Sequence, residues 1–211
     1  MTIDVFSSHR NASQAMLEPK RTGILVVDMV NDFCKPGGAM VLPGCEVLVP
    51  HQRAVLDAAR ETGAAIVWIH DSHRRAMRRD REFLKRSPHC IEGTWGVEII
   101  EDLGARPNDI HVVKHRHSGF FQTDLDLVLK DMMIDQVVVF GVVTNICVRS
   151  TVHDAFFNGY EVVVPKDCCA GTGIREHDST LYDIATHFGV VSRAANVVAS
   201  LLEGAIVENE E

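Results

Sequence analysis

The 211-residue chain lacks several features that would place a protein in a broad class at once. No apolar run is long enough to span a bilayer, and residues 1–20 lack the continuous apolar core of a signal peptide. The six cysteines have no regular spacing, so we expect reduced thiols and a cytoplasmic protein rather than a disulfide framework. A net charge of −8 argues against a nucleic-acid-binding surface.

Internal repeats, low-complexity linkers and breaks in composition are also absent, and the hydrophobic fraction of 46% suits a chain with a full core. We therefore expect one domain over residues 21–205, an N-terminal extension or arm over residues 1–20, and a frayed acidic tail over residues 206–211. A basic cluster between Arg74 and Arg86 is interrupted by Asp80 and Glu82, and is interpreted as a solvated loop or short helix.

Short apolar runs alternate along the chain with segments of helical periodicity. The runs are continuous and β-branched, as in strands covered on both faces, and span 23–27, 65–69, 110–113, 136–140 and 161–164, with 190–191 as a sixth, edge strand. The helical segments span 50–62, 94–103, 124–133, 145–158, 176–188 and 194–202, and Gly63 and Gly159 stand at expected C-terminal caps. This alternation predicts a three-layer α/β/α sandwich around a mostly parallel, Rossmann-like sheet of about six strands.

Three chemically useful residues fall at the carboxyl ends of predicted strands, where parallel α/β sheets bind ligands. Cys147 stands at the expected start of a helix, where the helix dipole and a nearby lysine would lower its pKa and favour the thiolate. Asp28 could serve as base and then as acid, while Lys114 would hold the carboxylate and thiolate together. Each residue alone also fits an ordinary role, as a small buried residue, a turn cap or a solvated lysine.

Three segments carry a resemblance to a known family. They are Val26-Val27-Asp28-Met29-Val30-Asn31-Asp32-Phe33, Val113-Lys114-His115-Arg116-His117-Ser118-Gly119-Phe120-Phe121-Gln122-Thr123-Asp124-Leu125 and Gly141-Val142-Val143-Thr144-Asn145-Ile146-Cys147-Val148. Over roughly residues 21–198 the chain resembles the isochorismatase-like cysteine hydrolases, which include nicotinamidases, N-carbamoylsarcosine amidases, and ureidoacrylate and biuret hydrolases.

The resemblance implies a triad of Asp28, Lys114 and Cys147 and a covalent thioester-type intermediate. It also implies a non-proline cis peptide at Val142–Val143, which directs the N–H of Val143 toward an oxyanion beside that of Cys147. Isochorismatases proper need no thiol, so Cys147 indicates hydrolysis of a C–N bond in a small non-peptide amide or ureido compound. The family further implies a homodimer or homotetramer and no organic cofactor.

A second group of residues follows the second predicted strand, and begins with Asp71-Ser72-His73. Together with His89, its carboxylate and imidazoles suit Zn²⁺ or a similar divalent ion, although a strand-end aspartate with surface histidines fits the spacing as well. The resemblance implies that Asp71, His73 and His89 bind a metal, as the matching residues do in nicotinamidases. Nicotinamidases usually place tryptophan and proline where this chain has Ser72 and Arg74.

Three functional hypotheses follow. A cysteine amidohydrolase is the first, a metal-dependent nicotinamidase the second, and a non-enzymatic structural paralogue the third. Phe33 and Trp95 are candidates for the wall of a substrate pocket, with core packing as the alternative. Asn145 could bind a ligand or a metal-bound water, or instead cap the helix that carries Cys147.

Overall fold

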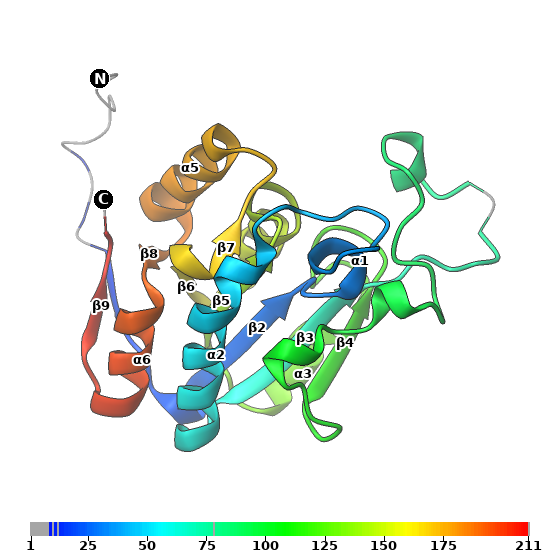
Figure 1. Ribbon diagram of the computed structural model, residues 1–211. Helices are drawn as coiled ribbons and strands as arrows, with labels where there is room; N and C mark the ends of the chain where they lie inside the picture. The colour runs from blue at the N-terminus through cyan, green and yellow to red at the C-terminus, as the bar shows by residue number, and fades with distance from the viewer. Residues whose placement is uncertain (1–8, 10, 12, 78, 211) are drawn as a thin grey trace.

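The computed structural model describes residues 9, 11, 13–77 and 79–210, in which a central sheet is covered by helices on both faces (Figure 1). Its strands lie in the order β4 (Ile110–Lys114), β3 (Ala65–Asp71), β2 (Thr22–Val27), β5 (Gln136–Val142), β6 (Glu161–Pro165) and β8 (Val190–Ser192). Neighbouring strands are parallel throughout, and the two-residue strand β7 (Cys169–Ala170) pairs with β5 as a seventh member. The predicted three-layer parallel α/β sandwich is confirmed.

The central strands are buried along their whole length. Every residue of β2 and β5 is inaccessible to solvent, whereas β4 at the edge alternates between buried and exposed residues. A strand covered by helices on both faces has no polar side, so its sequence is a continuous run of apolar residues. The two most apolar strands therefore lie side by side at the middle of the sheet.

Helices from the two halves of the chain form the outer layers. On one face, α2 (Cys45–Thr62) packs beside α6 (Ala194–Glu203), and α3 (Leu125–Asp131) and α4 (Arg149–Phe157) lie behind the sheet in Figure 1. The short helices α1 (Asn31–Cys34) and α5 (Ile174–Asp183) follow β2 and β7. Gly63 and Gly159 have left-handed φ values of 77° and 88°, as expected for residues that end helices.

The order of the strands creates a crevice between β2 and β5. After β2 the chain runs through α2 to β3 on one side, whereas after β5 it runs through α4 to β6 on the other. Right-handed crossovers send these two connections to opposite faces of the sheet. The loops therefore diverge at the carboxyl ends of β2 and β5, which is where open α/β sheets bind ligands.

One predicted helix is wrong. Residues 94–103 form two short 3-10 turns, Trp95–Val97 and Glu101–Leu103, instead of a continuous helix. The residues between them are drawn into an antiparallel bridge, because Asn31 N donates to Glu98 O at 3.0 Å and Ile100 N donates to Met29 O at 3.0 Å. Backbone pairing with the segment after β2 has overridden the local helical pattern.

The expected fraying of residues 206–211 is also not observed over its described part. Ile206–Glu208 forms strand β9, which pairs antiparallel with β1 (Gln14–Met16). Glu210 accepts hydrogen bonds from Arg193 and Asn196, both at 2.7 Å, so tertiary contacts hold a segment whose charge suggested a free tail.

Half of the expected N-terminal arm, residues 1–8, 10 and 12, lies outside the described residues. The homodimer or homotetramer and the cytoplasmic location stay predictions. No helix within the described ranges is long and apolar enough to cross a membrane.

A polar network ties α2 to the edge of the sheet. Arg60 donates to both oxygens of Asp109, at 3.0 and 2.9 Å, and Trp68 Nε1 donates to Asp109 Oδ2 at 2.9 Å. Burial acts to raise the pKa of Asp109, but the hydrogen bonds from Arg60 and Trp68 outweigh it and lower the pKa to about 2.

Replacing Asp109 by asparagine should lower the free energy of unfolding by about 1–3 kcal/mol, because it leaves the half-buried Arg60 without its charge partner. Urea denaturation at about pH 5 measures this loss, and the difference from wild type should shrink toward pH 2 as the native carboxylate is protonated. Asp57→Asn is the control, since its pair with Arg53 is 3.8 Å long and exposed, and we expect a loss below about 0.5 kcal/mol. Equal losses in both variants would contradict the assignment.

Candidate active site

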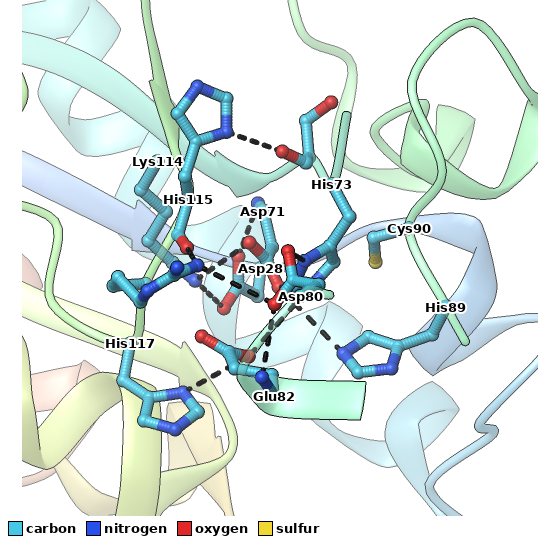
Figure 2. A network of polar contacts seen from close by, with 12 residues as sticks. Asp28, Asp71, His73, Asp80, Glu82, His89, Cys90, Lys114, His115 and His117 are labelled. Atoms are coloured by element: carbon cyan, nitrogen blue, oxygen red, sulfur yellow. Dashed lines mark hydrogen bonds and ion pairs between the residues drawn. The ribbon is translucent and has the colours of Figure 1, made fainter. Parts of the chain in front are cut away.

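Four polar residues converge at the carboxyl ends of the central strands. Asp28 follows β2, Asp71 ends β3 and Lys114 ends β4, while Cys147 lies in the turn after β5. Parallel pairing places Asp71 opposite Lys114, and these strand ends lie at one rim of the sheet. Figure 2 shows Asp28, Asp71 and Lys114 directed toward one another.

Glycine is required where β5 passes the end of β2. Gly141 pairs with Val27, and a Cβ atom at Gly141 would lie 2.0 Å from Val27 O. Its φ of 130° is also a value that residues with side chains rarely adopt. The close approach brings the turn that carries Cys147 next to Asp28.

Lys114 links the carboxylate of Asp28 to the thiol of Cys147. Its Nζ lies 2.8 Å from Asp28 Oδ2 and 3.7 Å from Cys147 Sγ, and the side chains of Asp28 and Lys114 are fully buried. The contact with Asp28 Oδ2 is an ion pair rather than an aligned hydrogen bond, which leaves this oxygen able to accept a proton. Asp28 Oδ1 instead accepts a hydrogen bond from the backbone of Asp71 at 2.8 Å.

Burial and charge set the protonation of these groups. Burial acts to lower the pKa of Lys114, but the charges of Asp28, Cys147 and Asp71 outweigh it and raise the pKa well above its ordinary value. Burial also raises the pKa of Asp28, against the opposing charge of Lys114. Lys114 is therefore an ammonium group at neutral pH.

The prediction that Cys147 is a thiolate is wrong. Burial raises the pKa of the Cys147 thiol well above its ordinary value, and Lys114 only partly offsets this. Cys147 does not open a helix but is the fourth residue of the π-helical turn Thr144–Val148, which precedes α4. The thiol is 9% exposed and lies near the carboxylates of Asp28 and Asp71, so the negative form is disfavoured.

The turn before Cys147 has the backbone that the resemblance implied. The peptide bond between Val142 and Val143 is cis. Asn145 does not cap the helix, which was the alternative considered for it; its side chain bonds to Thr172 instead.

The second predicted group of residues also comes together, with one more member. Side-chain atoms of Asp71, His73, Glu82 and His89 lie within 4.8 Å of one another and form a cluster that could hold a metal ion. Asp71 Oδ2 is 3.1 Å from His73 Nε2 and 3.9 Å from His89 Nε2, and Glu82 Oε2 is 3.7 Å from His73 Nε2. In Figure 2, Asp71 lies between Lys114 and His73.

Both histidines of this cluster are oriented through their other ring nitrogen. His73 Nδ1 lies 2.8 Å from Asp80 Oδ2, and His89 Nδ1 lies 2.7 Å from Ser87 O. A ring that donates its Nδ1–H keeps the lone pair on Nε2, which is the nitrogen directed into the cluster. Burial acts to lower the pKa of His73, but the hydrogen bonds and charges of Asp71 and Asp80 raise it to about 9, so binding of a cation by Nε2 would release a proton from this ring.

Sequence reasoning missed Glu82, Asp80 and His117. Asp80 and Glu82 are the two acids that interrupt the basic run, and the structure turns both inward onto His73. Two acidic residues inside an arginine-rich segment were the one sequence feature that could have indicated a buried role for them. His117 Nδ1 lies 3.9 Å from Cys147 Sγ and 3.7 Å from Glu82 Oε2, and nothing in its spacing from Lys114 indicated this.

The candidate pocket residues separate into two groups. Phe33 is buried, and its ring centroid lies 5.5 Å from that of His89, so it borders the cluster. Trp95 is 49% exposed and lines a hollow of about 520 Å³ with Asn31 and Glu98, away from the residues above. Core packing explains part of Phe33 but not the exposed Trp95, and the place of both residues in a substrate pocket stays a prediction.

Alkylation of Cys147 by iodoacetamide should be slow at neutral pH and should accelerate about tenfold per pH unit without levelling at the ordinary thiol pKa of about 8.5. The reason is that burial keeps the thiol protonated. Peptide mapping by mass spectrometry follows Cys147 apart from the other five cysteines, which are buried. An alkylation rate that levels off below about pH 8 would contradict this prediction and support the lowered thiol pKa expected from the sequence.

Comparison with known proteins places this geometry in a family. Residues 22–196 match the model of the isochorismatase domain. A cysteine hydrolase from Pseudomonas syringae pv. phaseolicola is 28% identical, with a TM-score of 0.84 over 91% of this chain and 97% of its own. N-carbamoylsarcosine amidase from Thermoplasma acidophilum is 31% identical, with a TM-score of 0.73 over 82% and 96% of the two chains. A nicotinamidase/pyrazinamidase from Bacillus subtilis is 26% identical, with a TM-score of 0.76 over 82% and 100%. Because the matched segment contains the whole parallel sheet and both groups of buried polar residues, the chain belongs to the isochorismatase family, as its resemblance implied.

Proposed function

We propose that the protein is a cysteine amidohydrolase that cleaves a C–N bond of a small non-peptide amide or ureido compound. The observation that carries this proposal is the buried arrangement in which Lys114 Nζ lies 2.8 Å from Asp28 and 3.7 Å from Cys147. Such an arrangement supplies a nucleophile, a base and a fixed positive charge. The similarity to an N-carbamoylsarcosine amidase and a cysteine hydrolase supports the same reaction class.

The first half-reaction forms a thioester. The thiol proton of Cys147 passes to Asp28 as Sγ attacks the substrate carbonyl carbon, because the resting thiol is protonated and Asp28 Oδ2 has no aligned hydrogen bond. The fixed charge of Lys114 stabilises the carboxylate before the transfer and the developing charge on sulfur during it. Asp28 then returns the proton to the leaving nitrogen, the C–N bond breaks, and ammonia or an amine departs.

The second half-reaction uses water. Asp28 takes a proton from water while the water oxygen attacks the thioester carbon. The C–S bond then breaks, the acid product leaves, and Asp28 returns the proton to Sγ. In both halves the negative oxygen of the tetrahedral intermediate is held by the backbone N–H groups of Val143 and Cys147, which the family resemblance assigns as the oxyanion hole.

Burial restricts the substrate to small molecules. Asp28 and Lys114 are fully buried and Cys147 is 9% exposed, so a folded polypeptide could not bring its backbone to Sγ. Phe33 would form part of the apolar wall beside the cluster. A compact amide or ureido group fits a site of this kind.

The cluster of Asp71, His73, Glu82 and His89 fits a divalent cation. Glu82 Oε1 and Asp71 Oδ1 are buried without a hydrogen-bond partner among the described residues, and the Nε2 atoms of both histidines approach the other oxygen of Asp71, Oδ2. Two imidazoles and two carboxylates are a ligand set typical of Zn²⁺, which we propose as the metal. A bound divalent cation would supply Lewis-acid polarisation of a substrate atom beside the nucleophile.

A specific alternative substrate is nicotinamide. The metal-type cluster beside the nucleophile and the similarity to a nicotinamidase/pyrazinamidase favour it. Ser72 and Arg74 replace the tryptophan and proline that nicotinamidases usually carry there, and the broader amide or ureido class is therefore our first proposal. A non-enzymatic paralogue is disfavoured because all three triad residues are present and in contact.

Ammonia release from a panel of small amides and ureido compounds tests the function directly. Cys147→Ala and Asp28→Asn should each lower kcat by more than about a thousandfold, because a nucleophile and its proton acceptor act as one unit. Cys34→Ala, which removes an equally buried thiol outside the site, should keep near wild-type turnover. Equal turnover of the same compound by wild type and Cys147→Ala would contradict the proposal.

Metal analysis of the purified protein should find about one zinc per chain, lost in His73→Ala and His89→Ala. Asp80→Asn should weaken zinc affinity by about 10–100-fold, because Asp80 orients the ring of His73 without entering the cluster. His111→Ala, at an exposed position of β4, is the control and should bind zinc normally. Nicotinamide hydrolysis that survives both chelation and His73→Ala would exclude the metal-dependent nicotinamidase.

A further inference from the structure

A second segment of the chain runs alongside the turn that carries Cys147. This segment, residues 169–177, starts as β7, which pairs in parallel with the end of β5 through Gly141↔Cys169 and Val142↔Ala170. It then continues into the first residues of α5. The backbone of the nucleophile turn is therefore flanked on one side by residues that follow it by about thirty positions.

Side chains extend this contact past the last backbone pair. Thr144 Oγ1 and His177 Nδ1 share a hydrogen bond of 2.8 Å. Asn145 and Thr172 bond to each other twice, since Asn145 Nδ2 donates to Thr172 Oγ1 and Thr172 N donates to Asn145 Oδ1, both at 3.0 Å. Two consecutive residues of the turn are thus each fixed to the same neighbouring segment.

The packing at this contact leaves little room for a side chain at Gly171. A Cβ atom at Gly171 would lie 3.0 Å from the Cβ of His177 and 3.2 Å from Asn145 Oδ1. Thr144 is fully buried, and burial lowers the pKa of His177, so the ring that meets the hydroxyl is neutral at pH 7. The Thr144–His177 hydrogen bond is therefore partly buried, whereas the two Asn145–Thr172 bonds are exposed.

Within the described chain, neither His177 nor Thr172 makes a polar contact with Asp28, Lys114 or Cys147. Their contacts fall on Thr144 and Asn145, which lie between the two proposed oxyanion donors, Val143 and Cys147. A change in the orientation of the turn would therefore redirect those N–H groups, whereas the charged partners of the thiol, Asp28 and Lys114, are held by other strands.

We propose that His177 and Thr172 are positioning residues that hold the turn 143–147 in the orientation in which its N–H groups bind an oxyanion. This inference rests on the proposed function for its oxyanion donors, but concerns residues outside the triad and outside the metal-type cluster. Stabilisation of a developing oxyanion depends steeply on the direction of the donors. Loss of a fixed orientation should therefore weaken oxyanion binding more than it changes the reactivity of the thiol.

The test compares two reactions of Cys147 that differ in their need for an oxyanion site. In the addition of acetaldehyde, Sγ bonds to the carbonyl carbon and the carbonyl oxygen becomes the oxygen of a thiohemiacetal, which lies where the oxyanion would. In alkylation by iodoacetamide, Sγ displaces iodide at a saturated carbon and no oxyanion forms. Protection of Cys147 by acetaldehyde against iodoacetamide gives the Kd for the aldehyde without any turnover.

Thr144→Val keeps the shape of the side chain and removes its hydroxyl, and His177→Ala removes the other partner. Both should raise the Kd for acetaldehyde by about 10–100-fold and lower kcat on any amide substrate to a similar extent, with alkylation rates within about twofold of wild type. Thr144→Ser and His177→Asn, which keep a polar atom at the contact, should recover most of the affinity. The double variant should be no weaker than either single variant, because both remove one interaction.

His187→Ala, at an exposed position of the π-helical turn that follows α5, is the matched control and should match wild type. Unchanged aldehyde affinity in Thr144→Val and His177→Ala would overturn the inference. An equal fall in aldehyde affinity and alkylation, without recovery in the conservative variants, would show general loosening and overturn it as well. A wild-type protein that binds acetaldehyde but cleaves no amide would refute the proposed function and leave this comparison valid.

Discussion

The burial of one ammonium group constrains the whole active end of the molecule. Lys114 is fully buried, and a lone charge in that position would cost several kcal/mol. The carboxylate of Asp28 at 2.8 Å offsets this cost only while β2, β3 and β4 keep their register, because the paired groups come from different strands. Removing either partner of a buried pair typically costs about 3–5 kcal/mol, so folding and reactivity depend on the same contact.

This constraint also explains why the thiol is not a thiolate at rest. One buried ammonium faces two buried carboxylates, Asp28 and Asp71, before any charge is placed on sulfur. A third negative charge would be unfavourable, so the proton stays on Cys147 until the substrate arrives. In the proposed reaction, attack by sulfur is therefore coupled to transfer of its proton to Asp28, the carboxylate that Lys114 contacts at 2.8 Å.

Much of the site could be predicted from sequence because parallel strands bring their carboxyl ends to one rim. Asp28, Asp71, Lys114 and Cys147 each stand at such an end, so a strand assignment was enough to group them. Glu82 and Asp80 could not be found in this way, since they lie in an irregular segment whose path is set by the histidine it covers. The helix predicted over residues 94–103 failed for a related reason. These residues pair with the segment after β2, and such a long-range contact leaves no signal in the local hydrophobic periodicity. The prediction of a lowered pKa for the Cys147 thiol failed because the burial of this residue depends on the assembled fold.

Asp71 belongs to both halves of the site. Its backbone N–H bonds to Asp28, its Oδ1 lies 3.9 Å from Lys114, and its Oδ2 lies 3.1 Å from His73. The carboxylate of Asp71 therefore contributes both to the charge balance around Lys114 and to the cluster with His73, Glu82 and His89. A substitution at this residue changes two functions at once and cannot apportion an effect between them. A change aimed at the proposed metal site can leave the proposed nucleophile untouched only at His73, Glu82 or His89, because Asp71 contacts both groups.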